Sequence, residues 1–264
     1  MRLISAIAIF MILLTTSVVY AYDLDRYQRY SNSKASEDEI TNMAGIAVYV
    51  YKSPYRGESI RVGGAPVIYW KKDRFFVRGS YAGVIVAHND ELELNVHLAP
   101  RLMGYDASET GYLNGMEDRE WSLDIGTELA WQIPKLDGAS LSLSFVNDIL
   151  GESDGREVTL SFSKMFDFKP FYFKPGISIE WQSEETIDHY YGVRGSEATA
   201  ARPSYSPDDA MNYSVNLDFY MGLSKDWLLV SSLKFNFLDD EISDSPIVDE
   251  DYTIMGLLGI TRMF

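Results

Sequence analysis

Residues 120–132 alternate between two kinds of side chain, and no other stretch constrains the fold as strongly. The odd positions, from Trp121 to Trp131, are mostly apolar, whereas the even positions are small or polar. A period of two is that of a β-strand. On a tilted strand the two tryptophans lie about 25 Å apart along a membrane normal, which matches the apolar band of an outer-membrane barrel. Strands of soluble β-sandwiches are usually about half this length.

Ten further segments have a comparable strand pattern, and no amphipathic helix of any length competes with them. In residues 212–223, apolar side chains such as Val215 and Leu217 alternate with polar ones such as Asn216 and Asp218. One face suits lipid and the other suits a wet lumen. The full set predicts an all-β, transmembrane, antiparallel up-and-down β-barrel. Its predicted strands are 43–51, 60–70, 74–87, 91–103, 120–132, 139–147, 156–165, 171–184, 212–223, 227–238 and 252–264.

The connections between these strands alternate in length, as expected for short periplasmic turns and long external loops. Eleven strands would place the two chain ends on opposite sides of the membrane. Splitting 74–87 near Gly79 and Ser80 into two short strands repairs the parity. The pattern therefore predicts about twelve strands, with ten as the alternative if this short pair lies outside the wall. Short turns are expected at 71–73, 88–90, 133–138, 166–170 and 224–226, and long loops at 52–59, 104–119, 148–155, 185–211 and 239–251.

The N-terminal residues have the pattern of a secretion signal. Arg2 precedes an apolar run over 3–14, and Val19-Tyr20-Ala21 is a small-residue cleavage site. We expect 1–21 to be a cleaved signal peptide, the alternative being an uncleaved membrane anchor. Residues 22–41 are polar and charged, which predicts a flexible periplasmic tail, with a lumen plug or a docking segment as alternatives. The barrel is expected over 42–264, in the outer membrane of a Gram-negative cell.

The composition excludes several classes of function. The chain has no cysteine, which excludes disulfides, thiolate zinc sites and cysteine nucleophiles. Its net charge of -16 argues against nucleic-acid binding. Acidic clusters at 184–188, 239–241 and 249–251 offer oxygen ligands for calcium or magnesium but lack the spacing of a defined calcium loop. They predict solvated charge rather than a metal site, with divalent bridging to anionic lipid head groups as the alternative. No cofactor is predicted.

The long loop at 185–211 is the best candidate for a functional site, because loops carry recognition on rigid barrels. The run Tyr190, Tyr191, Gly192 and Val193, and later Tyr205, holds aromatic and apolar groups that a purely solvated loop would not need. We expect these residues either to fold over the barrel mouth as a lid or to contact a partner.

Aromatic residues near the ends of strands predict how the barrel sits in lipid. Indole rings favour the level of the head groups. The predicted aromatic girdle consists of Trp121, Trp131, Trp181 and Trp227. The C-terminal residue, Phe264, is expected to serve as an assembly signal for the barrel assembly machinery.

A histidine on a polar strand face raises the question of catalysis. His97 falls beside Glu93 and Asn95, which suits a hydrogen-bond network in the lumen better than a hydrolase site with a lumen serine. No G-x-S-x-G, H-E-x-x-H or phosphate-cradling glycine loop occurs. No catalytic residue is therefore predicted.

Several short segments resemble one known family in their order along the chain. They are Y-K-S-P-Y-R-G at 51–57, P-V-I-Y-W at 66–70 followed by D-R-F-F at 73–76, Y-Y-G-V at 190–193 and S-P-I-V at 245–248. The chain is similar in these segments to the MipA/OmpV family of outer-membrane proteins. The resemblance implies a scaffold for murein synthesis that bridges a lytic transglycosylase and a penicillin-binding protein, surrounded by outer-membrane lipid and lipopolysaccharide. The alternatives are a narrow diffusion channel or a surface adhesin.

Overall fold

The computed structural model describes residues 42–58 and 60–264, so the predicted signal peptide at 1–21 and the predicted tail at 22–41 lie outside the described residues. Two short helices, α3 (Glu184–Tyr191) and α4 (Asp240–Ser243), lie in connections between strands. No helix within these ranges is long and apolar enough to cross a membrane. The strands are β1 (Met43–Lys52), β2 (Arg61–Lys72), β3 (Phe75–Arg78), β4 (Tyr81–His88), β5 (Leu92–Arg101), β6 (Ser122–Gln132), β7 (Ala139–Asp148), β8 (Arg156–Lys164), β9 (Phe166–Phe168), β10 (Phe171–Gln182), β11 (Ala210–Gly222), β12 (Trp227–Phe237) and β13 (Tyr252–Met263).

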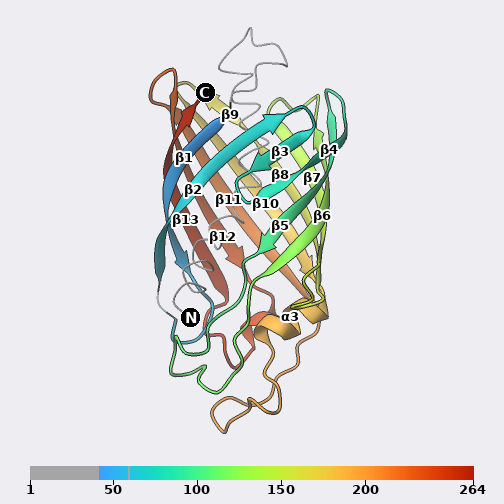
Figure 1. Cartoon of the computed structure of the whole chain (residues 1–264), viewed down its shortest axis with the longest axis vertical. Coiled ribbons are helices and arrows are strands. Elements are labelled where there is room, and N and C mark those ends of the chain that lie inside the picture. The colour runs from blue at the N-terminus through green and yellow to red at the C-terminus, as the bar shows by residue number, and fades with distance from the viewer. Residues whose placement is uncertain (1–41, 59) are drawn as a thin grey trace.

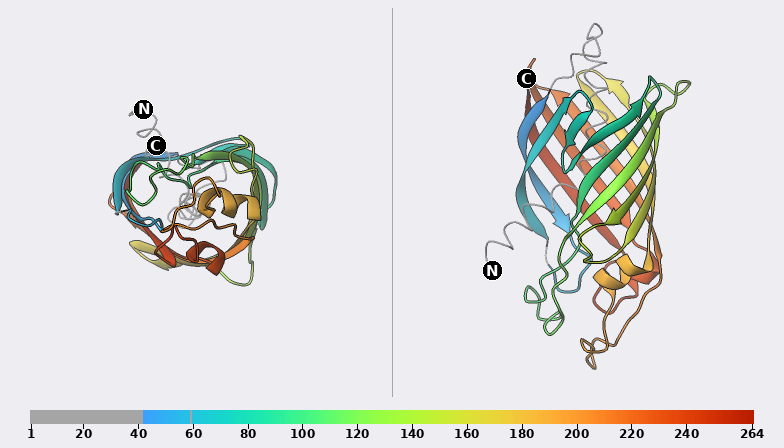
Figure 2. Two further views of the ribbon diagram at one scale, coloured as in Figure 1. Left: turned by 90° about the horizontal axis from the view of Figure 1, so that it is seen from below. Right: turned by 45° about the vertical axis from the view of Figure 1, so that its right-hand side comes forward.

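Antiparallel ladders close these strands into a barrel (Figures 1 and 2). The seam joins the first strand to the last, from the pair Met43 and Met263 to the pair Lys52 and Ile254. β10 pairs with β8 on one side and with β11 on the other. β9 pairs with the first three residues of β10 and adds a short flap to a wall of twelve strands. The predicted fold class and strand number are confirmed.

Side chains alternate between the lumen and the outer surface, as the period of two requires. In β11, Asn212 points inward and is 2% exposed, whereas its neighbour Tyr213 points outward and is 52% exposed. Large apolar side chains such as Ile177 and Leu258 cover the outer face. A closed wall of this kind is stable in lipid because the ladders pair the backbone N–H and C=O groups.

Tight turns lie at one end of the barrel and long connections at the other, as predicted. At the turn end, the N–H of Phe264 donates to the C=O of Asn42 at 2.9 Å, which holds the two ends of the barrel sequence together. The predicted split of 74–87 is also confirmed, because β3 and β4 are joined through Gly79, whose φ is +60°. The long connections at the loop end cover 53–60, 102–121, 149–155, 183–209 and 238–251.

The structure differs from the prediction in two connections. Residues 184–191 form helix α3 where a loop was expected, and Phe166–Phe168 form strand β9 where a turn was expected. Neither segment is long enough for its period to be evident in the sequence, since α3 has eight residues and β9 has three.

Packed apolar clusters occupy the lumen at both ends of the barrel. The cluster at the turn end is built from inward side chains of the first and last strands and of their neighbours, and Tyr69 and Tyr220 in it are each 1% exposed. Its other buried members are Met43, Ala47, Met165, Tyr172, Leu228, Val230 and Leu257. The second cluster lies at the loop end and forms the candidate site.

Candidate functional site

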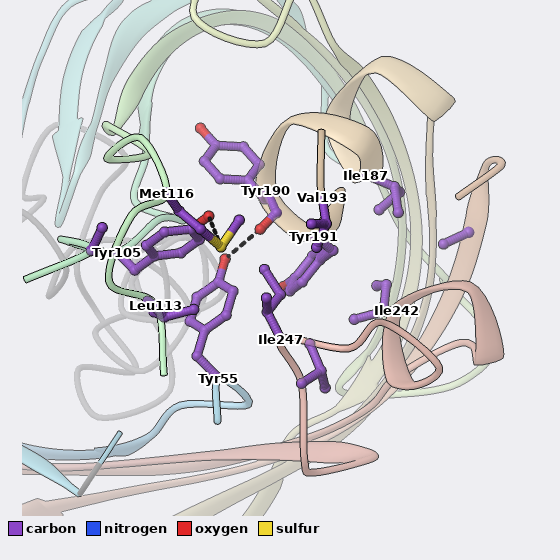
Figure 3. Close-up of a cluster of buried hydrophobic side chains, with 13 residues drawn as sticks. Tyr55, Tyr105, Leu113, Met116, Ile187, Tyr190, Tyr191, Val193, Ile242 and Ile247 are labelled. Carbon is purple, nitrogen blue, oxygen red and sulfur yellow. Dashed lines mark hydrogen bonds between the residues drawn. The ribbon is translucent and has the colours of Figure 1, made fainter. Parts of the chain in front are cut away.

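Four connections at the loop end fold inward and bury a common set of side chains (Figure 3). This set, here called the lid cluster, comprises Tyr55, Tyr105, Ala107, Leu113, Met116, Ile187, Tyr190, Tyr191, Val193, Ala210, Ile242, Ile247 and Val248. Burying aromatic and aliphatic surface of this extent stabilises the connections against the barrel mouth. The lid cluster therefore closes the loop end of the lumen.

Tyr55 contacts the three other connections of the lid cluster, one of them through an isolated antiparallel bridge with Val248. Its ring stacks on Tyr191 with a centroid distance of 5.5 Å and meets Tyr105 edge-on at 4.8 Å. Its hydroxyl donates to the C=O of Tyr190 at 3.1 Å (Figure 3). Burial raises the pKa of Tyr55 well above its ordinary value, so the phenol stays protonated and remains a donor.

Helix α3 brings the predicted loop residues into the lid cluster. Its buried residues, Thr186, Ile187, Tyr190 and Tyr191, recur at the spacing of one helical face, while the acidic Glu184 and its neighbour begin the first turn. The hydroxyl of Tyr190 donates to the C=O of Glu120 at 3.3 Å. Tyr190 thus joins α3 to the connection that precedes β6, whereas the C=O of Tyr191 accepts from the Ser245 hydroxyl at 2.6 Å.

The remaining predicted loop residues follow α3 directly. Gly192 ends the helix, and its N–H donates to the C=O of Asp188 at 2.9 Å. Val193 is buried and forms an isolated antiparallel bridge with Tyr205. The hydroxyl of Tyr205 donates to the C=O of Glu241 at 3.0 Å. The structure therefore brings all five predicted residues into or against the lid cluster, and their role as a lid or as a partner surface stays a prediction.

Two charged residues under the lid were not singled out from the sequence. Arg119 and Glu197 are each 4% exposed and form an ion pair at 3.0 Å. Arg202 adds a second guanidinium, which donates to the C=O of Glu197 at 2.8 Å. Burial opposes ionisation of Glu197, but the N–H of Glu117 and the Arg119 guanidinium outweigh it and lower the pKa of Glu197. No local pattern marks this pair, because its members come from different loops.

His189 lies on the flank of α3 and is only partly buried. Burial, reinforced by Arg119 and Arg194, lowers the pKa of His189 to about 4. Its ring meets Tyr190 edge-on at a centroid distance of 4.6 Å. The imidazole is therefore neutral while the lid is closed at neutral pH.

Below the lid cluster, the lumen contains a polar cavity of about 320 Å³. Arg101 pairs with Asp124 at 3.1 Å, and Arg78 pairs with Glu93 at 2.9 Å. The ring Nδ1 of His97 is 2.9 Å from the Asn95 Oδ1. Among the described residues, no serine hydroxyl hydrogen-bonds to the His97 ring. The site geometry thus provides a polar network in which Arg78 and Arg101 are already paired with carboxylates.

The three acidic clusters, at 184–188, 239–241 and 249–251, lie in the connections at the loop end of the barrel. Within residues 42–58 and 60–264, the structure contains no group of three or more acidic or histidine side chains arranged to hold a metal ion. Several of these carboxylates instead hold loop backbone: Asp239 accepts from the N–H groups of Glu241 and Met211, each at 3.0 Å.

Comparison with known proteins identifies the family. The family model described as MltA-interacting protein MipA matches residues 44–264. This chain belongs to the MipA family. As a MipA family member it is an outer-membrane β-barrel, and the resemblance in its ordered segments is confirmed.

The relatives of this MipA family member include an MltA-interacting protein and proteins named as outer-membrane proteins. The MltA-interacting protein of Escherichia coli (strain K12) is 26% identical over 223 residues, which cover 83% of this chain and 89% of that protein. The putative outer membrane protein YiaT of the same strain is 25% identical over 88% of this chain and 94% of its own length. The outer membrane protein OmpV of Vibrio cholerae is 28% identical over 61% of each chain.

Solved structures of outer-membrane barrels are similar to this MipA family member only at low sequence identity. An outer-membrane channel from Pseudomonas putida F1 has a TM-score of 0.42 and 10% identity, with 85% of this chain and 96% of that one covered. A bacterial polysaccharide outer membrane secretin has a TM-score of 0.44 at 10% identity, covering 84% of this chain and 98% of that one. No conclusion about function follows from likeness at this level.

The predicted membrane anchors lie on the outer face of this MipA family member. Trp121 and Trp181 lie at the external ends of β6 and β10, whereas Trp131 and Trp227 lie at periplasmic strand ends and are 38% and 42% exposed. Phe264 is 69% exposed beyond the end of β13. The girdle and the assembly signal stay predictions.

Proposed function

We propose that this chain is a non-enzymatic scaffold or adaptor for enzymes that synthesise and remodel murein. The name of its Escherichia coli relative, MltA-interacting protein, supports a lytic transglycosylase as one partner. A penicillin-binding protein is the second partner implied by the resemblance to the family. The proposed role is mechanical, because the barrel would hold both enzymes at the inner surface of the outer membrane.

The observation that carries this proposal is the packing of both ends of the lumen. The lid cluster fills the external mouth, and the cluster around Tyr69 and Tyr220 fills the periplasmic mouth. A barrel with both mouths filled offers its surface rather than an open pore to other molecules. Paired ionic groups such as Arg101 and Asp124 add to the stability of such a body rather than to a reaction.

The surface that a periplasmic enzyme would meet is the turn end. Basic side chains there outnumber acidic ones by eight to six, although the whole chain has a net charge of -16. The acidic residues are Asp73, Asp90, Glu91, Asp137, Asp167 and Asp226. The basic ones are Lys71, Lys72, Arg74, Lys135, Lys164, Lys169, Lys225 and Arg262. Opposite charges steer association and fix orientation. The proposed partner therefore presents an acidic face to this rim, and the predicted tail at 22–41 is a second proposed contact.

Crosslinking in intact envelopes tests the proposal. The mature chain is compared with a chain that lacks residues 22–41, and with a triple variant that carries Lys135→Glu, Lys169→Glu and Lys225→Glu. A matched control reverses three exposed external charges with Glu152→Lys, Glu184→Lys and Asp240→Lys. The scaffold predicts capture of a murein enzyme by the mature chain and by the external control, with loss in the tail deletion or in the periplasmic triple variant. Capture of no murein enzyme by the mature chain contradicts the scaffold.

A narrow diffusion channel is the second candidate, and the polar cavity of about 320 Å³ supports it. Conduction would require the lid cluster to open. Planar-bilayer recordings distinguish the two functions, because a scaffold with packed mouths gives no discrete conductance steps.

A further inference from the structure

The wall of the barrel is interrupted between β2 and β5. The β3–β4 hairpin between them ends part-way along the barrel (Figures 1 and 2). β3 covers only Tyr69–Lys72 of its neighbour, and the β4–β5 ladder begins at the pair Ala82 and Leu98. Among the described residues, no ladder pairs β2 with β5 directly. No backbone ladder therefore closes the wall on the external side of this hairpin, and this unpaired stretch between β2 and β5 is here called the slot.

The backbone of β2 has a defined direction toward this slot. The C=O of Ile68 accepts from the N–H of Gly79 at 2.8 Å, so it points toward β3 and away from β1. Alternate residues of a strand direct their N–H and C=O groups to the same neighbour. Gly64 and Pro66 therefore face the slot as well. Pro66 has no N–H, and so it adds no donor to this edge.

The opposite edge has the same feature. The C=O of Glu91, just before β5, accepts from the N–H of Gln132 in β6 at 2.6 Å, whereas the C=O of Leu92 accepts from the N–H of Asn89 on the β4 side at 2.8 Å. The backbone N–H and C=O groups of the even-numbered residues of β5 therefore point away from β6. Pro100 is one of them, and it lies beyond the last residue that pairs with β4. Both edges of the slot thus carry a proline that faces it.

Prolines at these positions are informative because an unpaired backbone donor is costly in lipid. A strand that is to be paired cannot use proline on its pairing side, and prolines are confined to unpaired edges. Two of them on opposite edges of one gap indicate edges that stay open. They also disfavour filling of the slot by an added strand.

The slot lies between the bilayer and the polar cavity. On its outer side the flanking side chains are apolar, with Val62 65% and Leu98 42% exposed. On its inner side, Arg61, Tyr81 and Ala99 line the cavity of about 320 Å³. This volume lies at the lower end of the range of small-molecule sites, roughly 300–1,000 Å³.

We propose that the slot is a side portal through which a single-chain amphiphile places its head group in the lumen cavity while its alkyl chain stays in the outer leaflet. This role is separate from scaffolding and does not depend on it. Because both mouths of the lumen are packed, the portal is the route by which the cavity communicates with the membrane.

The lining of the cavity indicates the class of head group. The wall formed by β7, β8 and β10 presents a run of hydroxyls, and two pairs of them, Ser140 with Ser163 and Ser161 with Ser178, hydrogen-bond at 2.9 Å. The guanidinium of Arg61, at the rim, already pairs with Glu58 at 2.6 Å. Hydroxyls donate and accept without charge. Acidic and basic side chains line the cavity in equal number, so they favour neither an anion nor a cation; they are Asp124, Glu128, Glu157 and Glu180, and Arg61, Arg101, Lys174 and Lys234. The head group that fits is therefore an uncharged polyhydroxylated one, such as a sugar.

Cysteine labelling tests the route, and the absence of native cysteine makes it unambiguous. Ala99→Cys is placed beside the slot, and Ala130→Cys is placed elsewhere on the same cavity; both parent side chains are buried at 6% and 3% exposure. Each variant is reconstituted in lipid nanodiscs and treated with N-dodecylmaleimide, which stays in the bilayer. The portal predicts labelling several-fold faster at Ala99→Cys. Equal rates, or no labelling at either position, would overturn it.

Filling the slot provides a second, independent test. Gly64→Phe, combined with Ala99→Cys, adds a ring at the slot edge where the nearest atom to a new Cβ is the Ala47 O at 3.8 Å. Gly256→Phe is the matched control, since its new Cβ would have a single neighbour, Leu233 Cδ1 at 3.9 Å, away from the slot. We expect Gly64→Phe to slow the labelling of Ala99→Cys, and Gly256→Phe to leave its rate unchanged. Equal rates in both double variants, with heat-modifiable migration showing that both barrels are folded, contradict the portal.

Protection by ligands tests the head group. Octyl glucoside below its micellar concentration is expected to slow the labelling of Ala99→Cys, while octyl sulfate at the same concentration leaves the rate unchanged. Equal protection by the sulfate would overturn the assignment of an uncharged sugar-like head group.

Discussion

The guanidinium of Arg119 donates two hydrogen bonds, at 3.1 and 3.0 Å, to the carboxylate of Glu197, which lies 78 residues further along the sequence. The same guanidinium donates from Nε to the C=O of His189 at 2.6 Å. One side chain thus ties the connection before β6 to both halves of the loop that contains α3. Both side chains are buried, so removing one of them leaves the charge of the other buried without its ionic partner.

Arg119→Ala is expected to destabilise the lid by about 3–5 kcal/mol, because it leaves Glu197 buried and unpaired. Hydrogen exchange of the external loops measures the effect. Arg194→Ala is the matched control, since Arg194 pairs with Glu117 at the surface, with 51% and 72% of the side chains exposed. Its expected cost is at most about 1 kcal/mol. Similar exchange in the two variants would mean that the buried pair does not hold the lid.

Tyr190→Ala with Tyr191→Ala separates the two predicted roles of the lid loop. Removing a buried aromatic ring costs about 3–5 kcal/mol where the neighbours cannot collapse into the space. If the tyrosines form a structural lid, heat stability falls and loop exchange rises, while partner capture is retained. If they form a recognition surface, stability is unchanged and capture is lost.

Acidification is expected to loosen the lid through His189. When the lid is open the histidine regains its ordinary pKa of 6.5, whereas in the closed lid its pKa is about 4. Between these values the open form binds the extra proton, so the stability of the closed lid is complete above pH 6.5 and declines as the pH falls toward 4. The charged and titratable groups that act on the ring are Arg119, Arg194, Asp148, Arg101 and Tyr190.

Protease cleavage of the external loops, measured between pH 4 and pH 7, follows this opening. A pepsin-type protease covers the acidic part of this range and a neutral protease the rest. The cleavage rate of an unstructured peptide substrate at each pH corrects for the pH dependence of the protease itself. His189→Gln cannot be protonated and should flatten the pH dependence over that range. An unchanged profile in His189→Gln would assign the effect to carboxylates instead.

Two adjacent glycines of β2 are expected to differ in tolerance. A Cβ on Gly63 would lie 2.3 Å from the ring of Tyr49, which is buried at 2% exposure and has to shift. Gly63→Ala should therefore cost about 1–3 kcal/mol by overpacking. Gly64→Ala meets only the Ala47 O at 3.8 Å and should be nearly neutral. Urea unfolding in lipid vesicles checks the pair, and equal midpoints would contradict the packing argument.

Phe264→Ala separates assembly from stability. The side chain is 69% exposed, while the backbone N–H that bonds to Asn42 is kept by any residue. We expect a lower yield of folded barrel in cells and an unchanged unfolding midpoint of the purified protein. A lowered midpoint would assign Phe264 a structural role, and an unchanged yield would remove its role as an assembly signal.

The wall could be predicted from local alternation because each strand carries its own inward and outward pattern. The bounds of β6, predicted as 120–132, differ from Ser122–Gln132 by two residues. The break at Gly79 followed from parity, since the chain has to return to the periplasmic side. What parity did not reveal is how short β3 is, because that length depends on where β2 and β5 diverge.

The lid could be anticipated only in part. Tyr190 and Tyr191 stood out as aromatic groups in a polar loop, but their helix was too short to be recognised by period. The partnership of Arg119 with Glu197 depends on loops that meet only in the folded barrel. Long-range ion pairs of this kind have no signature in a single sequence.

The seam between β1 and β13 has a consequence for the order of folding. Its ladder begins with Met43 opposite Met263, so one edge of β1 has no pairing strand until β13 has been synthesised. Closing a loop of that length carries an entropic cost, which the ladders between consecutive strands reduce but the seam itself has to complete. Until β13 arrives, the pairing edge of β1 is exposed and able to join the wrong chain. Completion of the barrel is thus a single late event, and we expect an unfinished chain to need protection of the β1 edge until β13 is present.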